Sequence, residues 1–300
     1  MGMTNSSTEL IRQVKSRENL LKALRNIRFN KGSKTPGTDG KKLREYVRME
    51  TEEFVTTMTE ALEDFHPHSL RRKEVPKENG KMRPIGIPTM KDRIIQQAIR
   101  QVIEPICEAQ FSSDSYGFRP KRSAENAVAA LSAHINLKRY YHIVDLDIEG
   151  FFDNVVHHTL LRQLWRIGIK DGEVIELIAR MLKADIVMPD GQKVKPERGT
   201  PQGGIISPLL ANVVLNDLDE WVNSKWRNRR TRKKYSRSGP KYEALRKSTK
   251  RLNLRSWHIV RYADDVKIVC ETKAAAERAY EAVVNYLQKR LGLKVNPDKS

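Results

Sequence analysis

The sequence predicts an α+β fold, in which helices and short strands are interleaved. Several stretches place apolar residues at the spacing of an amphipathic helix, and the strand-like stretches between them are short and mostly joined as hairpins. The chain lacks the regular alternation of strands and helices that would indicate a doubly wound parallel sheet. Hydrophobic residues make up 39% of the 300 residues, which is enough to bury a large core.

The first part of the chain predicts a helix, a loop and a hairpin. Apolar residues at helical spacing indicate a helix over residues 9–29, and a loop rich in Gly and Pro follows at 30–40. The loop lacks the spacing of a P-loop, so we assign it no nucleoside triphosphatase role. Residues 70–88 predict a hairpin, because Asn79 and Gly80 form a favoured two-residue turn.

Helical patterns dominate the middle of the chain. Helical spacing returns over residues 94–106, from 123 to 137 and over 171–184. Between the second and third of these helices, residues 141–147 predict a short strand whose last residue is Asp147.

The last third of the chain predicts a turn, a long helix, a second hairpin and a closing helix. Residues 199–204 (Gly-Thr-Pro-Gln-Gly-Gly) form a rigid turn, and the helix after it has Ser207 as its N-cap and Pro208 at its first position. Residues 257–270 predict a hairpin with two apolar arms. An amphipathic helix follows over 272–291.

The composition points to a polyanionic partner. The chain carries 56 Lys and Arg against 37 Asp and Glu, a formal net charge of +19, which indicates a nucleic acid or an anionic membrane surface. No apolar run approaches the roughly 20 residues that span a bilayer. Two cysteines, Cys107 and Cys270, are too few for a disulfide framework, so we expect a reducing, cytoplasmic location.

Most of the excess charge lies in one segment. Residues 225–255 contain 14 basic residues and a single acidic one, Glu243, so the segment carries +13. Trp226, Tyr235 and Tyr242 lie among them, and such rings stack on unpaired bases. A solvated loop is the alternative, but so one-sided a charge favours RNA and removes a membrane as partner. The residues that we expect to contact RNA are Lys225, Arg227, Arg229, Arg230, Arg232, Lys233, Lys234 and Arg237.

Adjacent carboxylates at the tip of the second hairpin are the sharpest chemical feature. Asp264 and Asp265 repel each other, and a divalent cation such as Mg²⁺ relieves that repulsion. A solvated turn is the alternative for this pair alone. Asp147 ends another apolar strand, and two strands that deliver carboxylates to one sheet edge can hold two magnesium ions for phosphoryl transfer. Asp145 points to the same strand face as Asp147 and is a rival ligand.

Three motifs occur in a family-specific order. They are Asp-Ile-Glu-Gly-Phe-Phe-Asp at 147–153, Gly-Thr-Pro-Gln-Gly-Gly at 199–204 and Tyr-Ala-Asp-Asp at 262–265. In this order they resemble the motifs of reverse transcriptases, and more closely those of bacterial group II intron reverse transcriptases, also called maturases. Further matches are residues 30–40, 77–88, 116–120 and 292–300.

The resemblance implies the fingers and palm of a right-hand polymerase, without its thumb. Fingers would comprise residues 1–125 and 155–198, and the palm 126–154 and 199–300, with the basic segment 225–255 as an insertion. Because the chain stops before the thumb, or X domain, and the C-terminal modules of the family, we expect a truncated fragment that is weak in processive synthesis. Bare apolar palm surface would then favour self-association, for example as a homodimer.

The resemblance also assigns the catalytic chemistry. Asp147 and Asp264 would bind two Mg²⁺ ions, Asp265 would complete the acidic cluster, and the backbone carbonyl of Ile148 would be a further ligand. A primer 3′-hydroxyl would attack the α-phosphate of a deoxynucleoside triphosphate, so that RNA is copied into DNA. The partners implied are an RNA template with its DNA primer, deoxynucleoside triphosphates and the parent group II intron RNA.

Five residues match positions that contact the nucleotide in the family: Lys77, Arg83, Phe152, Gln202 and Lys299. Lys77 and Arg83 would hold the triphosphate, although a basic ribbon facing solvent is the alternative. Phe152 would act as a steric gate against a 2′-hydroxyl, although simple core packing explains one of Phe151 and Phe152. Gln202 would contact nucleotide and template, and Lys299 would protonate the leaving pyrophosphate.

A second function class stays open at this point. The chain could be a nonenzymatic RNA-binding splicing cofactor with a vestigial active site. The intact acidic set, together with Phe152 and Gln202, argues against such decay. Both roles coexist in the resembled family, because a maturase assists the splicing of its own intron.

Overall fold

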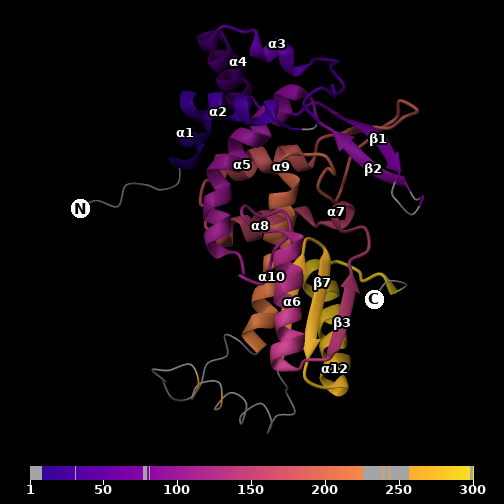
Figure 1. The fold of residues 1–300 in the computed structure, drawn as a ribbon. Coiled ribbons are helices and arrows are strands. Elements are labelled where there is room, and N and C mark those ends of the chain that lie inside the picture. Colours follow the sequence, from indigo (N-terminus) through magenta and orange to yellow (C-terminus); the bar gives the residue numbers. More distant parts are fainter. Residues whose placement is uncertain are drawn as a thin grey trace. The chain divides into compact units, whose positions relative to one another are not determined.

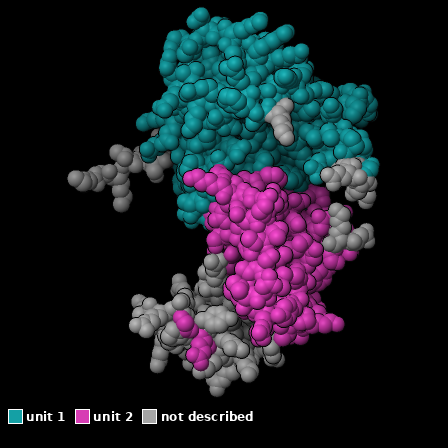
Figure 2. Space-filling model, viewed as in Figure 1, with its two compact units in different colours: residues 1–110, 152–213 teal, residues 111–151, 214–300 magenta. Residues whose placement is uncertain are grey.

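The chain divides into two compact units, each assembled from two separate segments (Figure 2). The computed structural model describes residues 9–30, 32–76, 80, 82–225, 239, 243, 257–297 and 300. Unit 1 comprises residues 1–110 and 152–213, and unit 2 comprises residues 111–151 and 214–300. Figure 1 labels most of the helices and strands.

Unit 1 has a helical core around the long helix α5 (Met90–Gln110). Its apolar residues Ile94, Ala98 and Ile103 are fully buried, as the predicted helical spacing requires. The other helices are α1 (Glu9–Lys15), α2 (Arg17–Arg28), α3 (Leu43–Val47), α4 (Thr51–Glu63), α8 (His157–Ile167) and α9 (Gly172–Leu182). Helices α3, α4 and α8 were not predicted from the sequence.

The helix predicted over residues 9–29 is two helices in the structure. Ser16 has an extended backbone, with φ −62° and ψ 141°, and its hydroxyl accepts a hydrogen bond from the backbone N–H of Asn19. Such an N-cap begins a new helix, because it satisfies an N–H that has no partner within the helix. The apolar pattern continues across the break, which is why the sequence predicted a single helix.

A four-stranded sheet with the order β2-β1-β4-β5 completes unit 1. The strands are β1 (Leu70–Pro76), β2 (Met82–Ile87), β4 (Ile186–Val187) and β5 (Lys193–Val194). β1 and β2 are antiparallel, which confirms the first predicted hairpin, and β4 pairs with β1 in parallel.

Unit 2 contains an antiparallel sheet with the order β3-β7-β6 (Figure 1). The strands are β3 (His142–Asp147), β6 (Trp257–Tyr262) and β7 (Asp265–Cys270), as predicted. Helices α6 (Ala124–Lys138) and α12 (Lys273–Tyr286) pack on this sheet, and a π-helical turn, Leu287–Leu291, extends α12. Ile268 and Val269 point to opposite sheet faces and are both fully buried, so both faces of β7 are covered.

Two further helices complete the described chain. The four-residue helix α7 (Phe151–Asn154) follows β3, and α10 (Ser207–Lys225) follows the glycine-rich turn. Ser207 is the first residue of α10 and donates a hydrogen bond from its hydroxyl to the carbonyl of Pro201 at 2.8 Å. Among the helices that the structure describes, none combines the length and apolar character needed to cross a bilayer.

Candidate active site

The sheet of unit 2 brings the three predicted catalytic carboxylates to one end. Asp147 on β3 lies directly opposite Asp265 on β7 in the antiparallel register. Asp264 precedes β7 in the turn that joins it to β6. The turn is tight, because Tyr262 and Asp265 are themselves register partners. Residues separated by more than one hundred positions in sequence thus share one edge of a sheet.

A short segment near the C-terminal end of unit 2 covers the end of β3. The backbone N–H of Asn296 donates to the carbonyl of Asp147 at 2.8 Å, and its side-chain amide donates to the Asp147 carboxylate at 3.4 Å. Ile148 and Val295 form an antiparallel bridge. Asn296 therefore orients Asp147. This role of Asn296 was not predicted from the sequence, although the residue lies inside the motif 292–300.

Lys267 on β7 lies between the carboxylates of Asp145 and Asp265, on the same face of the sheet as Asp147. Its ammonium donates to Asp145 and, at 2.8 Å, to Asp265. Partial burial opposes protonation, but the hydrogen bonds and negative charges of Asp145 and Asp265 outweigh it and raise the pKa of Lys267. Asp145, the rival ligand in the sequence analysis, is thus engaged by a cationic side chain.

The carboxylates suit a hard divalent cation by their donor chemistry. All available ligands are oxygen atoms, which Mg²⁺ prefers, and the side chain of Asp265 is 57% exposed. Among the described residues, no three acidic, histidine or cysteine side chains converge closely enough to hold a metal ion.

In unit 1, the glycine-rich turn 199–204 packs against α7. The N–H of Thr200 donates to the carbonyl of Phe152 at 2.6 Å, and the side-chain amide of Gln202 donates to the carboxylate of Asp153 at 3.3 Å. Phe151 is buried, whereas Phe152 is half-buried. Phe152 and Gln202 thus lie in two segments that are hydrogen-bonded to each other, and the side chain of Phe152 is partly accessible.

Two glycines make this close packing possible. Gly199 has φ +95°, and a Cβ there would lie 2.9 Å from the carbonyl oxygen of Asp153. Gly203 has φ +119°, and its Cβ would lie 2.7 Å from Ile85 and 2.8 Å from the carbonyl oxygen of Gly86. No L side chain fits these positions without a shift of the backbone.

The same turn is tied to strand β2. The N–H of Gly86 donates to the carbonyl of Gln202 at 2.8 Å. Arg83 is exposed on β2 opposite Val75, so its guanidinium is accessible. The strand that carries the predicted phosphate ligand is therefore hydrogen-bonded to the turn that carries Gln202.

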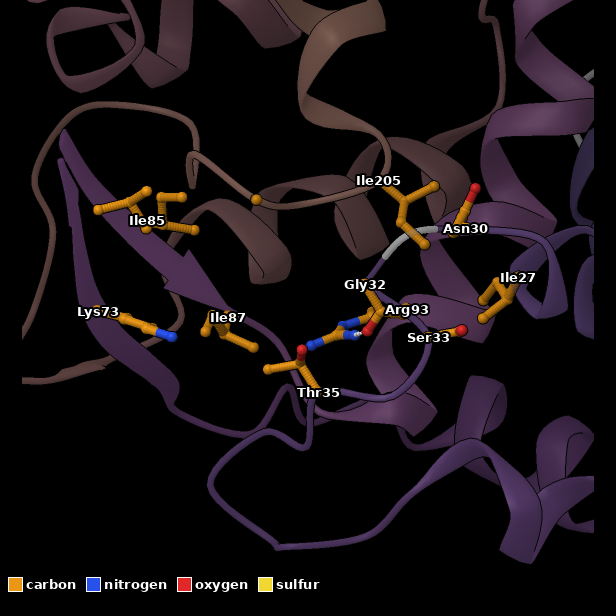
Figure 3. Close-up of a pocket in the computed structure, with 12 residues that line it drawn as sticks. Ile27, Asn30, Gly32, Ser33, Thr35, Lys73, Ile85, Ile87, Arg93 and Ile205 are labelled. Atoms are coloured by element: carbon orange, nitrogen blue, oxygen red, sulfur yellow. Dashed lines mark hydrogen bonds between the residues drawn. The ribbon is translucent and has the colours of Figure 1, made fainter. Parts of the chain in front are cut away.

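Unit 1 also contains a cavity of about 480 Å³ beside the turn (Figure 3). It is lined by Ile27, Asn30, Gly32, Ser33, Thr35, Lys73, Val75, Ile85, Ile87, Arg93, Gly203 and Ile205. Figure 3 shows the charged ends of Lys73 and Arg93 on either side of Ile87. Arg93 donates to the carbonyl of Gly32 at 2.8 Å, which anchors the 30–40 loop over the cavity. The lining combines aliphatic walls with two cationic groups.

Several predicted site residues lie outside the described residues. They are Lys77, Arg227, Arg229, Arg230, Arg232, Lys233, Lys234, Arg237 and Lys299. Lys225, of the predicted RNA-binding set, is described: it ends α10, and its ammonium lies 4.9 Å from the centre of the Trp221 ring.

Comparison with known proteins identifies the family. Residues 75–300 match the model of the family described as reverse transcriptase (RNA-dependent DNA polymerase). Protein YkfC of Escherichia coli K12 is 34% identical over 299 residues, covering 97% of this chain and 78% of YkfC. Group II intron-encoded protein LtrA of Lactococcus lactis subsp. cremoris is 38% identical over 236 residues, covering 78% of this chain and 38% of LtrA. The chain therefore spans well under half of LtrA.

A solved structure agrees on the fold. Apo telomerase from Candida tropicalis superposes with a TM-score of 0.53 at 15% identity, covering 79% of this chain and 44% of that chain. Reverse transcriptases as a family use divalent metal ions, in keeping with the oxygen-only donor set at the end of β3 and β7. The α+β expectation is confirmed, and so is the family resemblance: the chain belongs to the reverse transcriptases, the RNA-directed DNA polymerases, and the relatives it matches include group II intron-encoded proteins and an intron maturase.

Proposed function

We propose that this chain transfers deoxynucleotidyl groups from deoxynucleoside triphosphates to a primer 3′-hydroxyl on an RNA template, with release of pyrophosphate. One observation carries the proposal: Asp147 faces Asp265 in the β3–β7 register, and Asp264 is in the adjoining turn. We assign unit 1, with its β1–β2 hairpin, to the fingers, and unit 2, with the carboxylates, to the palm.

Asp147, Asp264, Asp265 and the carbonyl of Ile148 would hold two Mg²⁺ ions. When bound, the ions activate the attacking hydroxyl and stabilise the charge on the leaving oxygen. Asn296 orients the Asp147 carboxylate through its side-chain amide. Lys299 supplies a proton to the leaving pyrophosphate in this proposal.

The nucleotide-binding residues act through charge and shape. Arg83 and Lys77 neutralise the triphosphate. The Arg83 guanidinium donates two hydrogen bonds to phosphate oxygens at once, and the Lys77 ammonium acts as a point charge. The half-buried ring of Phe152 excludes a 2′-hydroxyl, and Gln202 contacts the new base pair. The cavity beside Gly203 suits template RNA, because its aliphatic walls fit base faces and Lys73 can meet a phosphate.

Primer extension on an RNA template tests the proposal. Asp264→Asn removes a carboxylate charge at nearly constant volume and should lower the extension rate by at least about a hundredfold, because electrostatic groups of this kind contribute that much. Asp190→Asn, an exposed turn residue of unit 1, is the matched control and should extend like the wild type. Equal rates for the Asp264→Asn variant and the wild type would contradict the proposed polymerase.

A second role is favoured by a separate observation, the +13 charge of residues 225–255. We propose that this segment binds group II intron RNA, which is the maturase role. A nonenzymatic splicing cofactor would show that RNA binding without primer extension, so the two activities are separable by measuring both on the same preparation. A homodimer and a cytoplasmic location stay predictions.

A further inference from the structure

A fully buried ion pair lies directly behind the turn that carries the catalytic carboxylates. Arg261, the residue before Tyr262 on β6, and Asp219 of α10 have side chains that are 1% and 0% exposed. The Arg261 Nε donates to one carboxylate oxygen of Asp219 at 2.9 Å and its terminal nitrogen donates to the other at 2.6 Å. This is the bidentate geometry that only a guanidinium provides.

The same guanidinium reaches the turn itself. Its remaining terminal nitrogen donates to the carbonyl of Ala263 at 2.8 Å, one residue before Asp264. Ala263 has φ +56°, a left-handed conformation that residues with a Cβ rarely adopt. A strained residue next to a reacting group persists only when its surroundings hold it there. Arg261 therefore links a long helix to the backbone of the catalytic turn.

A second element closes the other side of the turn. Gly117 belongs to the motif at 116–120, and a Cβ on it would lie 2.2 Å from the backbone nitrogen of Ala263. Arg119 fixes this loop by donating to the carbonyls of Ser112 and Ser115 at 2.6 and 2.9 Å. The N–H of Tyr116 donates to the carbonyl of Arg261 at 2.8 Å. The catalytic turn is thus held between the ion pair and a close-fitting loop.

Stability alone does not explain the ion pair. Replacing a buried pair by well-packed apolar residues is often neutral or stabilising, because the desolvation of both charges is costly. An apolar side chain at position 261 could fill the space, but it could not bond Asp219 and the Ala263 carbonyl at once. The arrangement favours a role in orientation.

We propose that Arg261, held by Asp219 and backed by Gly117, is a positioning residue that sets the orientation of Asp264 and Asp265 for metal binding. Arg261 acts through the turn and contacts no substrate. This inference rests on the proposed polymerase function, in which those carboxylates hold the metal ions.

The first experiment changes the ion pair. Arg261→Lys keeps the positive charge but removes the guanidinium that bonds both oxygens of Asp219. Asp219→Asn removes the negative charge of the partner. Glu52→Gln, which breaks the exposed ion pair with Arg17, is the matched control. Folding is checked by circular dichroism and thermal unfolding, Mn²⁺ binding by electron paramagnetic resonance, and kcat and KM by primer extension. We expect kcat and Mn²⁺ affinity to fall about 10- to 100-fold, as for other residues that orient metal ligands, with KM for the nucleotide changed less than about twofold.

The second experiment moves the turn and leaves the ion pair in place. Gly117→Ala should push on Ala263 and give the same loss of kcat and Mn²⁺ affinity. Gly172→Ala is its control, since a Cβ at Gly172 meets nothing within 4 Å. If the ion-pair variants do not fold, the Gly117→Ala variant decides the question.

Folded Arg261→Lys and Gly117→Ala proteins with wild-type kcat and Mn²⁺ affinity would overturn the positioning role. Failure of the polymerase function looks different, because the wild type itself would then not extend a primer, or Asp264→Asn would extend it normally. Mn²⁺ binding remains readable in that case and still tests the orientation of the carboxylates.

Discussion

Phe151 and Phe152 are adjacent in sequence but lie in different environments. Phe151 is 3% exposed and belongs to the core, whereas Phe152 is half-buried beside the glycine-rich turn. Residue type does not distinguish them, since both are apolar and both lie in the short helix α7. The resemblance to reverse transcriptases assigns the steric gate to Phe152, and the difference in burial supports that prediction.

Substitution of Phe152 by Val should admit ribonucleotides. A smaller side chain leaves room for the 2′-hydroxyl, and we expect discrimination against ribonucleoside triphosphates to fall about 10- to 200-fold, the range that one steric contact supplies. Single-nucleotide incorporation with matched deoxy- and ribonucleotides measures it. Phe29→Val, at a side chain that is 85% exposed, is the control. Discrimination equal to that of the wild type would remove Phe152 from the gate.

The two cysteines should resist alkylation in the folded protein. Burial raises the pKa of both Cys107 and Cys270 to about 12, and for Cys107 the nearby Glu108 and Glu104 add to the effect. Both thiols therefore stay protonated at pH 8, and the thiolate is the reactive form. We expect no iodoacetamide adducts by mass spectrometry on the native chain and two on the denatured chain. Rapid labelling of the native chain would contradict the burial of these residues.

At the level of elements, hairpins and long amphipathic helices were predictable, but breaks and small helices were not. The β6–β7 hairpin follows from two apolar arms around a polar tip, a local pattern of period two. The break at Ser16 depends on a side-chain cap, and α8 begins at His157 without a side-chain cap. Such boundaries depend on individual hydrogen bonds and tertiary packing, which periodicity does not report.

Gly203→Ala tests how tightly the glycine-rich turn is held. A Cβ at Gly203 meets both strain, from φ +119°, and close contacts with Ile85 and Gly86. Gly191 also has positive φ, +88°, but open space around it. We expect Gly191→Ala to cost about 1–2 kcal/mol of unfolding free energy from backbone strain alone. Gly203→Ala should cost at least about 1 kcal/mol more, since overpacking adds to the strain. Urea unfolding measures both, and equal losses would mean that the turn is loosely packed.

At the level of the whole molecule, charge distribution is more informative than net charge. Outside residues 225–255 the chain carries 42 basic and 36 acidic residues, so the segment holds most of the excess. The only acidic residue in this segment is Glu243. Long-range attraction to RNA should therefore depend on this segment more than on the rest of the surface.

Neutralising six basic residues of the segment should weaken RNA binding and flatten its salt dependence. The variant changes Arg229, Arg230, Arg232, Lys233, Lys234 and Arg237 to Gln. Each lost phosphate contact on single-stranded RNA should reduce the slope of log K against log salt by about 0.7. The measurement is filter binding of group II intron RNA over a salt series.

A control of equal charge change separates local contacts from net charge. It changes six exposed basic residues elsewhere to Gln, namely Arg12, Lys22, Arg25, Lys193, Lys289 and Arg290. We expect its salt slope to stay near that of the wild type. Equal slopes for both variants would show that binding follows the total charge and that the segment has no special role.

The sequence by itself determined the α+β class, the two hairpins, the carboxylates and the family, because these depend on local periodicity, turn chemistry and ordered motifs. The tertiary structure decided which distant residues meet. It placed Asp147 opposite Asp265, Asn296 against Asp147, and the Arg261 guanidinium between Asp219 and the Ala263 carbonyl. The physical reason is that local patterns encode backbone preferences, whereas strand register and buried ion pairs arise only when segments far apart in sequence pack together.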